Sequence, residues 1–516
     1  MESETPLISE PIKKRKSATE VQIRGSSLLL VGKLLSRGIN MLVDVLIVRH
    51  LTQADFGAFA YALSVVTIVK IIATFGMDRA VTRFVPIYQE QKDYRKMFGT
   101  VAMVFGFMIT LGLAMALLLN GFRSYAAEAF ISEQQALALL LIMIFLAPVQ
   151  AVDESIIGLF AVFASPKAIF FRKNIFGPLL KLGVVLLLIA GGGNVFILAW
   201  GQLGIGIVVV LIYILLLVRL LRPLAARENF SLRSMVIPWR EVLPFTIPLL
   251  SSDLMYLMMN QMDVIMLKYF QGVLDVASLR AIQPIAKMNQ TVLISFGLLF
   301  TPLAARMFAR GDRKGINGLY WHNAIWIAVA SFPIFALTFS LAKPITVLFF
   351  EERYADSAVF LALLSFGYYF NAALGQNGLT LKVYGKLRYS VTLNIAAGFA
   401  NLGINYLLIP RYGALGAAIG TTSTLVLHNI FKQAGLRLGT GISVFDPKYR
   451  RVYGIIIVAA LSVGLVQTVL DPPVYVSIGL AGVASILVFR LNRHLLNVEE
   501  TFPELLRLPL MRWLLG

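Results

Sequence analysis

The chain has 516 residues, of which 58% are hydrophobic and only 14% are charged, and its mean hydropathy is +0.78. A water-soluble chain of this size has about 25% charged residues, so the composition excludes a soluble domain and indicates a polytopic membrane protein. The net charge is +19, and the absence of cysteine excludes disulfides, thiolate metal sites and cysteine nucleophiles. The four histidines are scattered, so no metal site is expected.

Apolar stretches of spanning length recur between residues 26 and 491 and predict an all-α fold with about 14 transmembrane helices. A basic tail over 1–25 precedes them and is expected to be disordered in the cytoplasm. The tail over 492–516 is too short to span and fits either an interfacial helix or a frayed end. The predicted spans are 26–48, 57–77, 98–120, 136–158, 174–190, 195–218, 242–267, 278–302, 319–341, 357–379, 390–409, 413–435, 452–470 and 474–491.

Basic residues concentrate in the loops that follow even-numbered spans, and the other loops hold few of them. Because cytoplasmic loops carry an excess of Lys and Arg, both termini are expected in the cytoplasm. This concentration of basic residues in cytoplasmic loops explains the positive net charge, so we do not expect nucleic acid as a partner. The outer loops are all short, which argues against a glycan polymerase or ligase, since such an enzyme is expected to hold its catalytic groups in a substantial outer domain.

The first predicted span is an apolar segment with one polar face. Lys33, Arg37, Asn40 and Asp44 fall within a narrow arc at about 100° per residue. Because lipid accepts such groups only at a high cost, this face is expected to line a cavity or contact a partner.

An internal repeat relates the two halves of the chain at an offset near 220 residues. Asp44 to Arg49 (DVLIVR) resembles Asp263 to Lys268 (DVIMLK), and 158–193 aligns with 378–413 without a gap. Six spans return the chain to the same side, so the two copies are parallel and are expected to flank a central cavity, as in an alternating-access transporter. The predicted parts are an N-lobe (26–218), a cytoplasmic linker (219–241), a C-lobe (242–435) and two further spans (436–491).

Most intramembrane charges lie on the equivalent spans 1 and 7 and spans 2 and 8. Five bases predict a net cationic cavity that binds an anionic substrate, because arginine in particular offers bidentate contacts to phosphate oxygens. Three acids are candidates for binding a coupling proton or Na⁺, or for ion pairs with these bases. Internal pairing that only holds helices together is the alternative for every one of these charges. The bases are Lys33, Arg37, Lys70, Arg280 and Lys287, and the acids are Asp44, Asp253 and Asp263.

No soluble-enzyme motif stands out in the chain. There is no GxxxxGK[ST] sequence, so the chain is not expected to hydrolyse ATP. We therefore expect neither catalytic residues nor a cofactor.

Three stretches resemble a known family. GINMLVDVLIVRHLTQADFGAFAYALSVV (38–66), followed by FGMDRAVTRFVP (75–86), resembles the opening of the polysaccharide transporters, which are O-antigen and exopolysaccharide-type flippases of lipid-linked oligosaccharides. PRYGALGAAIGTTST (410–424) resembles the second lobe of the same family. This resemblance implies the multidrug/oligosaccharidyl-lipid/polysaccharide exporter fold.

The resemblance also implies a function. It implies movement of a polyprenyl-pyrophosphate glycan from the cytoplasmic to the outer leaflet of a prokaryotic plasma membrane, for export of cell-surface polysaccharide. The implied partners are the lipid-linked glycan, membrane lipids, a polysaccharide polymerase and glycosyltransferases. Related flippases carry cavity bases on the first helices of each lobe, and Arg49 matches a recurring family arginine. Four residues match the placement of the cavity bases, namely Lys33, Arg37, Arg280 and Lys287.

Three other functions are alternatives to this one. A cation-coupled multidrug exporter of the same fold predicts a cavity rich in carboxylates and aromatic rings. A glycan polymerase or ligase predicts chain extension by the purified protein. A scaffold subunit of a glycan assembly complex predicts that a transport-dead mutant still complements.

Overall fold

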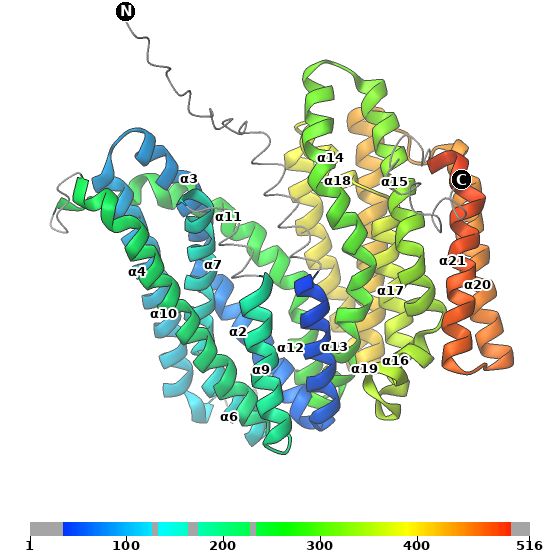
Figure 1. Cartoon of the computed structure of the whole chain (residues 1–516), viewed down its shortest axis with the longest axis horizontal. Helices are drawn as coiled ribbons and strands as arrows, with labels where there is room; N and C mark the ends of the chain where they lie inside the picture. Colours follow the sequence, from blue (N-terminus) through cyan, green and yellow to red (C-terminus); the bar gives the residue numbers. More distant parts are fainter. Residues whose placement is uncertain (1–34, 126–132, 164–173, 228–233, 497–516) are drawn as a thin grey trace, which may run out of the picture.

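The structure is a computed structural model of the chain that describes residues 35–125, 133–163, 174–227 and 234–496. Within these ranges all regular structure is helical, which confirms the all-α fold. Figure 1 shows two bundles side by side, the first coloured blue to teal and the second green to orange, with the last two helices at the far edge of the second bundle. The predicted tail over 1–25 and most of the tail over 492–516 lie outside the described residues.

The first bundle begins with the helix over 35–50. Phe75 and Gly76 have positive φ angles and separate α2 from α3 near the end of the second predicted span. Because α3 follows directly, the helical path continues well beyond the predicted end at residue 77. The helices that follow residue 50 are α2 (Gln53–Thr74), α3 (Met77–Glu90), α4 (Tyr94–Gly121), α6 (Gln134–Met143), α7 (Leu146–Phe163), α9 (Gly177–Ala190) and α10 (Val195–Arg227).

The second bundle begins with α11 (Trp239–Asn260), so helix ends reach into the predicted linker over 219–241 from both sides. The next helices are α12 (Met262–Phe270), α13 (Val273–Lys287), η3 (Met288–Gln290), α14 (Thr291–Ala309), α15 (Arg313–Phe335), η4 (Ala336–Ser340) and α16 (Ala342–Phe350). They are followed by η5 (Glu352–Ser357), α17 (Ala358–Ala373), α18 (Asn377–Val383), α19 (Leu387–Thr440), η6 (Pro447–Tyr449), α20 (Arg450–Leu470) and α21 (Val474–Leu496).

The long element α19 contains two antiparallel helices. Gly413 interrupts it with a φ of 55° and a ψ of −133°. Tyr389 donates a hydrogen bond to the carbonyl of Phe431 at 2.7 Å, and Asn401 contacts Thr424 at 3.4 Å, so the chain reverses direction at Gly413. The two halves correspond to the eleventh and twelfth predicted spans.

In the described ranges, nine helices are long and apolar enough to cross a membrane, or ten if the bent α13–α14 pair counts as one span. This confirms a multi-pass membrane protein. The number is below fourteen because α19 holds two spans, α9 is short, breaks divide other spans, and part of the first span is not described. Helical segments lie over every predicted span from the second to the fourteenth, and the count of fourteen stays a prediction.

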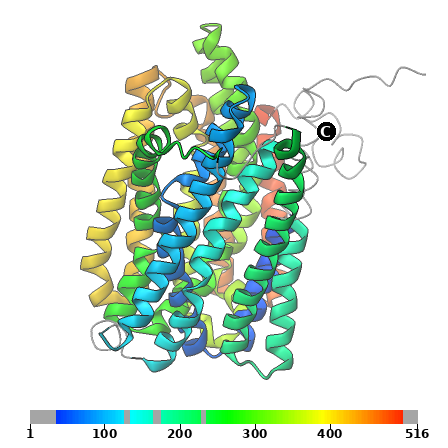
Figure 2. The same ribbon diagram turned by 90° about the vertical axis from the view of Figure 1, so that its left-hand side faces the viewer.

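The bundles have two distinct ends. In Figure 1, α16 lies at the lower end, and α3 lies at the upper end. We call these the α16 end and the α3 end. Figure 2, turned by 90°, shows the helices of the first bundle running side by side between the two ends, with the α14–α15 hairpin extending beyond them at the α3 end.

The two bundles approach each other most closely where α2 meets α13. A Cβ atom on Gly57 of α2 would overlap the backbone carbonyl of Val273, at the start of α13. Only glycine therefore allows this contact between helices of different lobes. The contact places α13, with its basic side chains, directly against the N-lobe.

We expect Gly57→Ala to destabilise the protein. The added methyl group must displace backbone, and overpacking of this kind costs about 1–3 kcal/mol. Gly106→Ala is the matched control, because a Cβ there meets nothing within 4 Å and alanine favours the helix interior. The midpoint of thermal unfolding in detergent should fall for the first variant only, and equal midpoints would show that the α2–α13 contact is not tight.

Candidate functional site

Two adjoining hollows lie between the lobes. The hollow nearer the α16 end has a volume of about 380 Å³, and its wall includes Asp44, Arg280 and Lys287. The hollow nearer the α3 end has a volume of about 620 Å³ and is lined from α2, α3, α7, α11 and α19. Thr67 and Gln261 line both hollows, so the two meet at that level. The first hollow is lined from the predicted spans 1, 2, 7 and 8, and the second also has lining residues from spans 4 and 11.

Two arginines join the lobes at the α16 end. Arg49 donates hydrogen bonds to the last carbonyls of α16, those of Leu348 at 2.5 Å and Phe349 at 2.9 Å. Arg353 donates in return to three carbonyls at the end of the first helix, those of Val48, Arg49 and Leu51, each at 2.8 Å. Each guanidinium satisfies carbonyls that a helix terminus leaves free and interacts favourably with the negative end of the helix dipole.

An ion pair with one buried partner adds to this connection. Lys268, only 4% exposed in its side chain, lies 2.7 Å from Glu133, which precedes α6. Lys268 corresponds to Arg49 in the internal repeat, and Glu133 corresponds to Arg353 at an offset of 220. Equivalent positions of both lobes therefore connect to the opposite lobe at the same end of the molecule.

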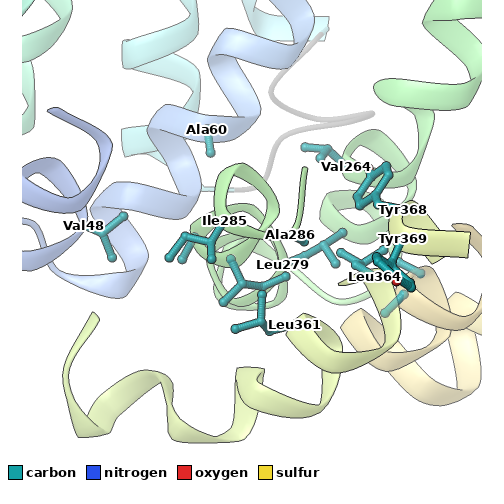
Figure 3. Close-up of a cluster of buried hydrophobic side chains, with 14 of the residues drawn as sticks. Val48, Ala60, Val264, Leu279, Ile285, Ala286, Leu361, Leu364, Tyr368 and Tyr369 are labelled. Atoms are coloured by element: carbon teal, nitrogen blue, oxygen red, sulfur yellow. The ribbon is translucent and has the colours of Figure 1, made fainter. Parts of the chain in front are cut away.

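Apolar side chains fill the space beside these polar contacts. Figure 3 shows α13 between the N-terminal helices and α17, and its labelled side chains belong to one buried cluster. From the N-lobe come Val48 and Ala60, from α13 Leu279 and Ile285, and from α17 Leu361 and Leu364. Apolar packing and charged contacts together hold the lobes closed at the α16 end.

At the α3 end, α11 makes polar contacts with the N-lobe. Asp253 lies 2.5 Å from Arg79 of α3. Glu241, in the first turn of α11 and before the predicted span, accepts hydrogen bonds from Tyr88 at 2.6 Å and Lys96 at 2.8 Å. These bonds hold the pKa of the Glu241 carboxyl below its usual value. Because α11 also packs along α19, it bridges the two lobes.

Arg280 is the most extensively bonded base of the site. Its bonds cross the break between α11 and α12 and fix α13 against both that break and α2. Its Nε atom is buried and has no partner among the described residues. Its two terminal nitrogens donate to Gln283 at 2.8 Å, Ser64 at 2.9 Å, Gln261 at 2.6 Å and the carbonyl of Asn260 at 3.3 Å.

Asp263 is buried, with 2% exposure, and accepts a hydrogen bond from the side chain of Gln283 at 3.1 Å. It therefore reaches Arg280 through Gln283, and the structure records no direct ion pair between Asp263 and Arg280. Asp44 lines the hollow from the opposite side, and it has no hydrogen bond or ion pair within the described ranges.

Lys287 lies at the end of α13 and lines the same hollow. Among the residues that the structure describes, it forms no hydrogen bond or ion pair. Its ammonium group is half-buried and is therefore available to an anion in the hollow.

The other predicted bases have different surroundings. Lys70 lies 2.7 Å from Glu154 at the wall of the second hollow, so this pair is internal. Arg37 lines neither of the two hollows, and Lys33 lies outside the described residues. The described lining carries as many acidic as basic side chains, whereas the sequence predicted a net positive one.

Several lining residues were missed by the sequence reasoning. Arg79 was assigned to a loop, because the second span was expected to end at 77, but α3 carries it into the wall of the hollow. Gln261 lies at a helix break that hydropathy does not reveal. Arg353, which joins the lobes and lines neither hollow, was also missed, although it had one detectable signal, since it lies in a loop that otherwise holds few basic residues.

Residues 23–308, more than half of the chain, match the family described as polysaccharide biosynthesis protein. The chain belongs to this polysaccharide biosynthesis family. Residues 248–407 also match the MatE family. These matches confirm the resemblance seen in the sequence.

Relatives and solved structures support the same fold. An uncharacterized membrane protein of Methanocaldococcus jannaschii is 24% identical over 437 residues, which cover 81% of this chain and 84% of the relative. The structure of the lipid II flippase MurJ, in an inward closed conformation, is similar with a TM-score of 0.71 and 14% identity, covering 91% of this chain and 99% of that one. An inward-facing MATE multidrug transporter of the MOP superfamily has a TM-score of 0.60 and 16% identity, with coverages of 78% and 93%. This member of the polysaccharide biosynthesis family therefore has the MOP transporter fold.

Proposed function

We propose that this protein is a flippase for a polyprenyl-pyrophosphate-linked oligosaccharide, which it moves from the cytoplasmic to the outer leaflet of a prokaryotic plasma membrane for export of cell-surface polysaccharide of the O-antigen or exopolysaccharide type. The observation that carries the proposal is the hollow between the lobes, which Arg280 and Lys287 line and in which Lys287 forms no hydrogen bond or ion pair with the described residues. Membership of the polysaccharide biosynthesis family supports a glycan as the cargo.

The proposed substrate has three chemically different parts. Its pyrophosphate would lie against Lys287, because an unpaired ammonium in a partly buried place favours an anion. The sugars would contact neutral polar side chains of the wall, such as Gln261, Gln283 and Asn394. The polyprenyl chain would stay in lipid, where its apolar surface is already stable.

Alternating access would proceed by rocking of the two lobes. The excess of Lys and Arg in the loops at the α3 end supports a cytoplasmic location for that end. The observed state is joined at the α16 end, so the outward-open state requires the Arg49, Arg353 and Lys268 contacts to break. The break at Gln261 and the proline of α13, Pro284, are positions where these helices can bend.

Energy coupling would involve Asp44, because it is the predicted acid that lines the first hollow and has no hydrogen bond or ion pair in the described ranges. Asp253 is paired with Arg79, and Asp263 is hydrogen-bonded to Gln283. An unpaired carboxylate in a hollow is a reasonable place for a proton or Na⁺ to bind.

Asp44 and the match to the MatE family also favour a second candidate, a cation-coupled exporter of small molecules. Purified protein in lipid vesicles distinguishes the two functions. We expect a fluorescent polyprenyl-pyrophosphate oligosaccharide to change leaflets, as detected by loss of accessibility to an added lectin, and we expect no accumulation of a cationic dye under a proton gradient. Dye accumulation without glycolipid movement would overturn the flippase assignment.

The expected partners follow from this chemistry. Glycosyltransferases must build the lipid-linked glycan on the cytoplasmic side before the protein acts. A polysaccharide polymerase would use the translocated glycan on the outer side.

A further inference from the structure

A second group of basic residues lies inside the C-lobe, apart from the central hollows. Gly378 and Lys382 are four residues apart on α18, and His428 and Lys432 are four residues apart on the second half of α19, so each pair shares one helix face. A Cβ atom on Gly378 would lie 3.7 Å from the Nζ atom of Lys432, which shows that the two faces meet. A hydrogen bond of 3.2 Å between Asn377 and Asn429 also joins the two helices.

The two lysines have no compensating partner. Lys432 is half-buried, Lys382 is exposed, and neither forms a hydrogen bond or an ion pair within the part of the chain that the structure describes. Lys382 instead acts on Lys432 as a like charge. Lys432 loses part of its hydration in this place and is repelled by the adjoining Lys382, so a purely structural role would be better served by an apolar side chain or by a carboxylate partner.

The internal repeat shows that the fold does not require these charges. At the offset of 220, the N-lobe keeps the glycine, since Gly158 corresponds to Gly378. When the same offset is continued through the helix that follows residue 413, the three polar positions are apolar in the N-lobe, where Lys382, His428 and Lys432 correspond to Val162, Val208 and Ile212. The equivalent helix pair, α7 and α10, therefore packs without a base at these three positions, and the charges are a separate property of the C-lobe.

The position of the cluster connects it to the central site. His428 Nε2 lies 2.9 Å from Asn394 Oδ1, and Asn394 lines the hollow nearer the α3 end. Lys432 precedes the end of α19 at Thr440 by eight residues, or about 12 Å along the helix. A lysine at this depth can reach the headgroup level of the adjoining leaflet.

We propose that Lys382 and Lys432, over the open surface of Gly378, form a subsite for a phosphoryl group carried by a lipid. The missing side chain at Gly378 leaves room beside the Lys432 ammonium group, and the two cations together match a divalent phosphate. The identity of the lipid rests on the proposed function, in which this subsite would receive the substrate's phosphate at the α3 end before the headgroup enters the hollow.

Binding to the purified protein tests the subsite without transport. The midpoint of thermal unfolding in detergent is measured against increasing polyprenyl monophosphate, because a ligand that binds the folded state raises this midpoint. Separate titrations use phosphatidylglycerol micelles and inorganic phosphate.

Two variants alter the subsite in different ways. The double variant Lys382→Val with Lys432→Ile installs the N-lobe residues, which this helix pair tolerates, and Gly378→Val fills the space while keeping both charges. Lys314→Ala, which removes an exposed lysine of α15, is the matched control. Midpoints without ligand show whether each variant folds.

We expect polyprenyl monophosphate to raise the midpoint of the wild type and of Lys314→Ala. We expect its half-saturating concentration to rise at least about tenfold in both subsite variants, because each loses a charge-assisted contact. Equal half-saturating concentrations in wild type and variants would overturn the subsite. A full shift with inorganic phosphate alone would overturn its assignment to a lipid, whereas a shift with phosphatidylglycerol would support a lipid-borne phosphate of broader identity.

The two proposals can fail separately. If the subsite variants lose binding but the vesicle assay shows no glycolipid movement, the proposed function fails alone. If glycolipid moves and the variants bind as the wild type does, this inference fails alone.

Discussion

Joining Glu133 to Lys268 covalently is expected to abolish transport. The two side chains form an ion pair between the lobes at the α16 end, and the outward-open state requires this end to separate. The chain has no cysteine, so Glu133→Cys with Lys268→Cys introduces the only two thiols. A short bifunctional thiol reagent should stop glycolipid movement in vesicles, and cleavage by a reductant should restore it.

The control crosslink lies away from the lobe contact. Gln467→Cys with Ser477→Cys replaces a hydrogen-bonded pair, 2.6 Å apart, that joins α20 to α21. This crosslink should leave transport unchanged, as should the reagent on each single-cysteine variant. Full transport by the Glu133–Lys268 crosslinked protein would contradict movement at the α16 end.

Removing contacts between the lobes at the α16 end should open that end. Arg353→Ala removes three charge-assisted hydrogen bonds to the first helix, each of a kind worth about 1.5–3 kcal/mol. A cysteine at Ala60, in the wall of the hollow, should then react roughly tenfold faster or more with a water-soluble thiol reagent added from that side. Lys343→Ala, which removes an exposed lysine of α16, is the control and should not change this rate.

Lys287→Met is expected to reduce glycolipid movement by about 30-fold or more. Lys287 is the lining base without a partner in the described ranges, and the loss of a partly buried contact between opposite charges costs about 2–5 kcal/mol. Methionine keeps most of the volume, so the unfolding midpoint should stay near that of the wild type. Lys287→Arg keeps the charge and should retain part of the activity.

Two further variants make the test specific. Lys70→Met removes a base whose charge is already matched by Glu154, so it should reduce transport less than Lys287→Met does. Arg37→Ala tests the predicted base that lines neither hollow. Normal transport by both Lys287→Met and Arg37→Ala would overturn the assignment of the substrate-binding bases.

The repeat is the sequence feature that the structure makes most informative. The similarity of Asp44–Arg49 to Asp263–Lys268 predicted two equivalent helix ends. In the structure, both terminal bases reach the opposite lobe, but the two acids differ, because Asp263 is hydrogen-bonded whereas Asp44 lines the hollow without a partner in the described ranges. A repeat predicts equivalent positions, and the surroundings of each copy then decide the role of the residue.

The sequence by itself determined the membrane class, the positions of the spans and the family. These properties depend on the composition and the sequence of short segments, since about 20 apolar residues suffice to predict a span. The polar face of the first span also depends on local sequence, because helical spacing alone places residues on one face.

Only the tertiary structure decided which charges remain available. Lys70 meets Glu154 across 84 residues of sequence, Arg79 meets Asp253 across 174, and Arg353 meets the first helix across about 300. An ion pair forms only when two side chains come within about 4 Å, and this depends on which helices adjoin and on where they break. Hydropathy and periodicity contain neither piece of information, so Lys287 could be separated from the paired bases only after the helices were packed together.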